Sequence, residues 1–179
     1  SDAVRVVNAL LTQLDGLRRF PNALVLATSN LTGAVDAAFL DRADIKQYVG
    51  PPGLDARYAI LASCLAELGR AGVVALAPPG PLSLDELRPM VPRADTSFVL
   101  LARLTNVASV AAHHSLMLSA LARECDGLSG RALRKLPLLA HALFAPSGAD
   151  GRALEAAAFL RALHRAIAYE RASRGALGQ

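Results

Sequence analysis

Three polar side chains carry most of the chemistry that this sequence offers: Asn30, Arg42 and Arg131. An asparagine carboxamide donates and accepts hydrogen bonds without carrying charge, so it can orient a water molecule. The two arginines supply fixed positive charge for an anion. Groups of this kind can bind and orient polar or anionic ligands.

Arg131 stands at the start of a predicted helix. Ser129 is a suitable N-cap, which places Gly130 and Arg131 in the first turn. The helix dipole is positive at that end and does not attract a cation, so a structural purpose for the arginine is weak. An anion held by both the helix end and Arg131 would account for it. An ordinary solvated arginine is the alternative.

Asn30 ends a short apolar segment. The run 23–28 is continuously apolar and bounded by turn residues, which predicts a strand buried on both faces of a parallel sheet. Ligands and catalytic groups gather at the carboxyl ends of such strands, and Asn30 lies there. The alternative is an asparagine that satisfies a turn.

Arg42 lies between two acids, in Asp41-Arg42-Ala43-Asp44. An intramolecular pair with Asp41 or Asp44 is therefore one interpretation. A functional interpretation is compatible with it, because neighbouring acids can orient an arginine that acts elsewhere.

The elements that position these side chains divide at the Gly/Pro cluster 50–53. Before it we predict an amphipathic helix over 2–17, the strand 23–28, one or two helical turns over 35–40 and a strand over 44–49. After it we predict a loop over 72–81 and a short helix that begins at Ser83. We also predict helices over 54–68, 129–144 and 153–171, and one or two helices over 97–125. Glu86 completes a capping box with Ser83, and the tail from Ser173 is expected to fray.

Bulk properties exclude several function classes. The net charge is +4, but the basic residues are scattered, so direct nucleic-acid binding is not expected. Cys64 and Cys125 match no metal or redox spacing, and we predict no metal site. The most apolar stretch, 97–122, is interrupted by charged and histidine residues, so no membrane span is expected. The chain begins without Met inside a helical pattern, which suggests a fragment.

Several strings of sequence resemble the pachytene-checkpoint, or thyroid-receptor-interacting, family of AAA+ ATPases. They are residues 1–15, Thr28-Ser29-Asn30, Asp41 to Tyr48, Gly127 to Pro137 and Leu139 to Leu143. The resemblance covers most of the chain. It implies an α/β remnant of the AAA+ large domain over 1–52, followed by an all-α helical lid over 53–179.

The resemblance also implies roles for the site residues. Asn30 matches sensor 1, which orients the attacking water. Arg42 matches an arginine finger acting on the neighbouring subunit, and Arg131, with Ser129 and Gly130, matches the sensor 2 segment that binds nucleotide. ATP and Mg²⁺ are the implied cofactors. The Walker A and Walker B motifs and the Mg²⁺ ligands are expected upstream of Ser1, so the chain alone should be inactive.

The same resemblance implies a homo-hexamer that remodels HORMA-domain proteins with an adaptor. The implied processes are meiotic recombination, its checkpoint and the spindle checkpoint, in the nucleus and cytoplasm. Residues 92–112 are longer than the family pattern and suggest an insertion. Another AAA+ unfoldase and a non-catalytic helical interaction domain remain the alternatives.

Overall fold

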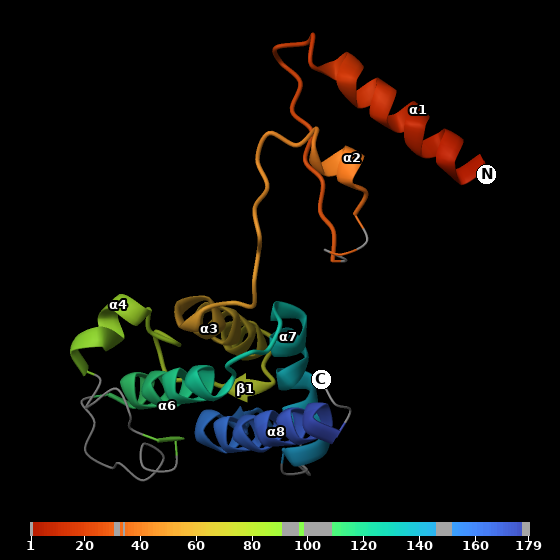
Figure 1. Cartoon of the computed structure of the whole chain (residues 1–179). Coiled ribbons are helices and arrows are strands. Elements are labelled where there is room, and N and C mark those ends of the chain that lie inside the picture. Colours follow the sequence, from red (N-terminus) through yellow and green to blue (C-terminus); the bar gives the residue numbers. More distant parts are fainter. Residues whose placement is uncertain are drawn as a thin grey trace. The chain divides into compact units, whose positions relative to one another are not determined.

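The computed structural model of the 179-residue chain describes residues 2–30, 33, 35–90, 97–98, 109–145 and 152–176. Its internal contacts divide it into two compact units, Ser1–Val49 and Gly50–Gln179 (Figure 1). The predicted insertion at 92–112 lies outside the described residues, apart from 97–98 and 109–112.

The described part of the first unit contains two helices. Helix α1 spans Asp2–Leu17, which confirms the amphipathic helix predicted over 2–17. Helix α2 is a single turn, Ala37–Leu40, capped by Asp36, whose carboxylate accepts a hydrogen bond of 2.8 Å from the amide of Ala38. This cap begins the turn that leads to Arg42.

The two strands predicted for the first unit do not form in the structure. Segments 23–28 and 44–49 run without strand hydrogen bonds, and their apolar side chains face solvent rather than a core. Leu24, Leu26 and Ile45 are 82%, 84% and 86% exposed. A strand acquires its hydrogen bonds from a neighbour, and the described part of the chain supplies none to either segment. The structure therefore does not show the buried strands predicted over 23–28 and 44–49.

The second unit is a helical domain around one apolar core. Its long helices are α3 (Leu54–Arg70), α6 (Val110–Glu124), α7 (Gly130–Leu139) and α8 (Ala156–Ala176). Helix α3 packs on α6 and α7, and α8 packs on the same two helices (Figure 1). Fully buried side chains from these helices include Leu61, Met117, Leu121, Leu133, Phe159 and Leu163. Burial of this kind stabilises each helix more than its own propensity does.

The second unit also contains a short parallel pair of strands. Strand β1 (Val74–Ala75) pairs with β2 (Leu154–Glu155), with Val74 opposite Leu154. The sequence prediction placed a loop and a helix start here, so the second unit is not purely helical. Val74 is 1% exposed, and this burial explains why a pairing of two residues persists.

Shorter elements complete the unit. Helix α4 (Leu84–Leu87) begins at the predicted capping box: the Ser83 amide donates to Glu86 Oε2 at 2.7 Å. A 3₁₀ turn, η1, follows over Arg88–Met90.

The helix predicted over 129–144 is divided in two. Pro137 lies inside α7, where it lacks the amide that an α-helix needs, and a π-helix, η2 (Ala140–Phe144), follows. The tail predicted to fray from Ser173 instead continues as helix to Ala176. None of the helices in the described ranges is long and apolar enough to cross a membrane.

Candidate functional site

The N-terminus of α7 is the best formed part of the candidate site. Gly127, with φ of 75°, makes a left-handed turn that a side chain would strain, and it separates α6 from α7. Ser129 then caps α7, accepting a hydrogen bond of 3.3 Å from the Ala132 amide on its Oγ. The predicted cap is thus confirmed, and it fixes where the first turn begins.

The first turn of α7 presents donors to solvent. The Leu133 amide donates to the Ser129 carbonyl, so Ser129 accounts for the amides of Ala132 and Leu133. Within the described residues, the amides of Gly130 and Arg131 are not used in this way, the Arg131 side chain is exposed, and the turn contains no acid. Together, the backbone amides, the positive end of the helix dipole and the Arg131 guanidinium favour the binding of an anion.

Gly130 keeps this turn open. A β-carbon built on Gly130 would lie 3.8 Å from Ile60 Cδ1, an ordinary contact distance. Neither its backbone conformation nor its packing within the described part of the chain requires glycine. A glycine at this place lets a ligand approach the backbone closely.

Arg42 is held against α1. Its Nε lies 3.0 Å and 3.1 Å from the two carboxylate oxygens of Asp15, and its Nη2 lies 3.0 Å from Oδ2. Its Nη1 donates to the Ala38 carbonyl at 2.8 Å, and Arg18 donates to the Arg42 carbonyl at 3.0 Å. The side chain is 33% exposed. A two-pronged contact of this kind fixes the plane of the guanidinium.

The acid that holds Arg42 is not one of its sequence neighbours. The sequence suggests Asp41 or Asp44 as the partner, whereas the structure places Asp15 there, and Asp44 Oδ1 lies 3.8 Å from Arg18 Nη2 instead. Pattern reasoning missed this pair because the two residues are far apart in the sequence. The described contacts engage three of the five N–H groups of Arg42, so the arginine can still reach a further acceptor.

Asn30 is exposed and stands at a bend after the extended segment. It does not end a hydrogen-bonded strand, because segment 23–28 has no strand partner in the described residues. Asn30 and Arg42 belong to the first unit, whereas Ser129, Gly130 and Arg131 belong to the second.

Sequence reasoning overlooked Arg57. This residue is 8% exposed, and its guanidinium contacts Ala122, Pro52 and Asp126. A usable signal was present, since Arg57 lies four and eight residues before Leu61 and Leu65 on the apolar stripe of α3. A charge on a buried stripe needs a partner.

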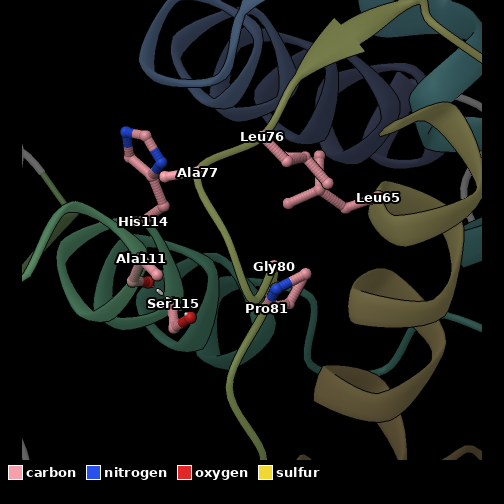
Figure 2. Close-up of a pocket in the computed structure, with 8 residues that line it drawn as sticks. All are labelled: Leu65, Leu76, Ala77, Gly80, Pro81, Ala111, His114 and Ser115. Atoms are coloured by element: carbon pink, nitrogen blue, oxygen red, sulfur yellow. Dashed lines mark hydrogen bonds between the residues drawn. The ribbon is translucent and has the colours of Figure 1, made fainter. Parts of the chain in front are cut away.

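A small pocket lies between α3, α6 and the segment 76–81 (Figure 2). Leu65 and Leu76 point toward one another across it, and the Ser115 hydroxyl donates to the Ala111 carbonyl at 2.7 Å. Its cavity of about 10 Å³ has room for roughly one water molecule. It is too small for a nucleotide and belongs to the packing of the unit.

Two groups whose pKa values are raised to about 12, Tyr58 and Cys125, lie in the core. Burial raises the pKa of Tyr58 to about 12, and burial likewise raises the pKa of Cys125 to about 12. The Tyr58 hydroxyl donates to the Leu82 carbonyl at 2.5 Å, which is a structural use. In the part of the chain that is described, no three His, Cys, Asp or Glu side chains group as metal ligands do.

Residues 53–171 of the chain match a known protein family. They match the family model of the TRIP13-like AAA+ ATPase lid C-terminal domain. This range covers α3 to most of α8 and includes the N-terminus of α7.

Individual relatives extend the similarity into the first unit. The chain is 51% identical over 168 residues to a pachytene checkpoint protein 2 homolog of Oryza sativa subsp. indica, covering 91% of this chain and 33% of that protein. It is 46% identical over 144 residues to the Homo sapiens homolog, covering 80% and 30%. The solved structure of C. elegans PCH-2 matches 97% of this chain and 40% of that chain, with 36% identity and a TM-score of 0.67. The chain therefore spans about a third of the length of the curated relatives it matches.

Proposed function

The chain belongs to the TRIP13-like family of AAA+ ATPases, and from this premise we propose that it forms the nucleotide-sensing C-terminal part of an ATP-driven protein remodeller. Residues 1–52 supply the last part of the large α/β domain and residues 53–179 supply the lid. The likeness of 97% of the chain to C. elegans PCH-2 supports the first assignment, since this likeness includes the first unit.

The N-terminus of α7 carries the proposal. Arg131 is exposed beside the positive end of a helix whose first turn contains no acid, and Ser129 fixes where that turn begins. The helix dipole does not favour a cation at this end, whereas a bound anion would interact favourably with both the helix end and Arg131. We assign Arg131 to the γ-phosphate of ATP, and the amides of Gly130 and Arg131 to the same anion. The lid would then take its position from the nucleotide bound.

Arg42 is proposed to act on the neighbouring subunit. Asp15 holds its guanidinium by two prongs and leaves further N–H groups for a phosphate oxygen. An arginine oriented in advance loses less freedom when it binds, and a finger supplied in trans accelerates hydrolysis by roughly a thousandfold or more. The pair with Asp15 therefore supports this role rather than competing with it.

Asn30 is proposed to orient the attacking water. Its exposed carboxamide is uncharged and able to donate and accept, and it follows a segment of strand-like composition. We propose that segments 23–28 and 44–49 become strands when the remainder of the large domain pairs with them. Asn30 would then stand at the carboxyl end of a parallel strand.

The remaining proposals concern the whole protein. Mg²⁺ would be held by residues in the part of the relatives that this chain does not match, and it would neutralise charge on the ATP phosphates. We propose a homo-hexamer that opens HORMA-domain proteins with an adaptor, in meiotic recombination, its checkpoint and the spindle checkpoint. The nucleus and cytoplasm are the corresponding compartments. The curated relatives are named for the pachytene checkpoint, and this name supports the checkpoint part of the proposal.

Steady-state ATP turnover of the full-length protein tests the proposal. Arg131→Ala should lower kcat about 100-fold, because it removes a charged group from the γ-phosphate. Lys135→Ala, which removes an exposed cation one turn further along α7, is the matched control and should leave turnover within about twofold. Equal turnover in the wild type and in Arg131→Ala would reject the assignment of α7.

A further inference from the structure

Arg57 is a buried charge that joins separate segments of the second unit. It projects from the first turns of α3 and is 8% exposed. Its Nε donates to the Ala122 carbonyl at 2.9 Å, and its Nη1 lies 3.3 Å from the Pro52 carbonyl. The same Nη1 forms an ion pair with the carboxylate of Asp126. One side chain thus contacts the entry to the unit, the end of α6 and the turn before α7.

The partners explain why an arginine stands there. Ala122 lies in the last turn of α6, where carbonyls have no partner within the helix and where the dipole favours a cation. The guanidinium can serve this carbonyl and two further acceptors at once because its donors point in fixed, different directions. A lysine keeps the charge but loses that geometry.

Stability alone is a weak reason for this arrangement. Buried ion pairs can often be replaced by apolar side chains at little cost, so a core position does not require one. Moreover, Asp126 is 81% exposed at its side chain, and its carboxylate contributes little to the core. The arrangement instead specifies geometry, since it fixes three backbone segments to one another.

Two of those segments matter for the proposed site. Pro52 belongs to the Gly/Pro segment with which the second unit begins. Asp126 directly precedes Gly127 and lies three residues before the Ser129 cap, so its contact with Arg57 restrains the turn that leads into α7. Helix α3 also approaches that turn directly, through Ile60 beside Gly130.

We propose that Arg57 is a positioning residue that holds the Pro52 segment and the Asp126 turn together, so that the N-terminus of α7 and Arg131 are placed relative to the entry of the lid. This inference rests on the proposed function, in which Arg131 binds nucleotide. Arg57 itself touches no substrate, and its effect on turnover passes through α7.

Hydrogen exchange in the full-length protein gives the first test. Asp126→Asn removes the ion pair at an exposed position and should preserve the fold, whereas Arg57→Lys keeps the charge without the fork. Both variants should speed amide exchange over 127–133 by about tenfold. The control is Glu170→Gln, which breaks the 3.0 Å pair with Arg174 on α8 and should leave that exchange unchanged. Unchanged exchange in Asp126→Asn would overturn the positioning role.

A double-mutant cycle with Arg131→Ala gives the second test. Asp126→Asn should lower kcat for ATP about tenfold when Arg131 is present, since a misplacement of about 1 Å costs up to about 100-fold. In the Arg131→Ala background the same substitution should change kcat less than about twofold. If the two substitutions instead lower kcat by factors that multiply in the double variant, Arg57 and Asp126 do not act through Arg131. That result would overturn the inference.

The two tests separate this inference from the proposed function. If Arg131→Ala alone leaves kcat unchanged, the nucleotide role of α7 fails. Exchange over 127–133 still decides whether Arg57 positions that turn. If Arg131→Ala lowers kcat while Asp126→Asn changes neither exchange nor turnover, the proposed function stands and the role of Arg57 is rejected.

Discussion

The two units differ in the burial of their apolar side chains. In the second unit, leucine, methionine and phenylalanine side chains from four long helices are fully buried against one another. In the described part of the first unit, Leu11 is the one buried apolar side chain, and Leu24, Leu26 and Val49 are 82%, 84% and 84% exposed. The same residue types therefore make a core in one unit and an uncovered surface in the other.

The difference follows from where each element finds its hydrogen bonds. A helix satisfies its backbone within one segment, so α1 forms although most of its apolar face is exposed. A strand needs a neighbour, and segments 23–28 and 44–49 have none in the described residues. The lid can thus be understood from its own sequence, whereas segments 23–28 and 44–49 lack neighbouring strands within the described residues.

The two proposed phosphate-binding arginines differ in a related way. Arg42 is held by Asp15 and Ala38, whereas Arg131 is exposed at a helix end. A held arginine is suited to a fixed role across a subunit boundary. An exposed arginine beside helix amides responds more strongly to the arrival or loss of an anion.

The largest effect on stability should come from the core of the second unit. Leu121→Ala should lower the free energy of unfolding of the chain by about 3 kcal/mol, because it removes a fully buried side chain and leaves a cavity. Leu26→Ala should change it by less than about 0.5 kcal/mol, since Leu26 is 84% exposed. Guanidinium unfolding followed by helical circular dichroism measures both. Comparable losses in the two variants would mean that segment 23–28 is packed after all.

Alkaline pH should weaken the second unit by a smaller amount. Burial raises the pKa of Tyr58 to about 12, above its ordinary value of 10.0, so the folded state holds this proton more tightly than the unfolded state. The associated stability is complete below pH 10 and is lost as pH rises to about 12. The difference in unfolding free energy between wild type and Tyr58→Phe should therefore narrow by about 2 kcal/mol over that range.

Cys125 also loses its proton at alkaline pH, but it does not affect the comparison of wild type with Tyr58→Phe. Its pKa is also raised to about 12 by burial, so it contributes to the alkaline loss in both proteins and cancels from their difference. Denaturant titrations at a series of pH values measure the narrowing. A difference that stays constant from pH 10 to 12 would show that Tyr58 is not shielded from solvent.

The smallest effect is expected at the surface of the first unit. Asp44 Oδ1 lies 3.8 Å from Arg18 Nη2, and the side chains of Asp44 and Arg18 are 93% and 59% exposed. Solvent screens such a pair, so Asp44→Ala should change the unfolding free energy by less than about 0.5 kcal/mol. A larger loss in the same unfolding experiment would indicate that Arg18, which also donates to the Arg42 carbonyl, depends on Asp44 for its position.

Local patterns in the sequence predicted the helical elements and their caps well. The helix 2–17, the Ser129 cap and the Ser83–Glu86 capping box are all confirmed. Each rests on residues within one or two turns of one another, so periodicity and capping chemistry are enough.

Features that depend on distant residues were not predictable in this way. Asp15 and Arg42, Arg57 and Asp126, and Val74 and Leu154 meet only in the folded chain. Strand formation in the first unit fails for the same reason, because the apolar runs are present without their neighbours. Arg57 is the exception that could have been found, as a charge on the buried stripe of α3.

Arg131 is proposed to distinguish ATP from ADP by binding the γ-phosphate. Nucleotide affinity of the full-length protein tests it most directly, by calorimetric titration of wild type and Arg131→Ala with each nucleotide. A charged hydrogen bond contributes about 1.5–3 kcal/mol, so Arg131→Ala should weaken ATP binding by about tenfold to 100-fold while ADP binding changes less than about twofold. Equal weakening of ATP and ADP, or no change in either, would contradict the account.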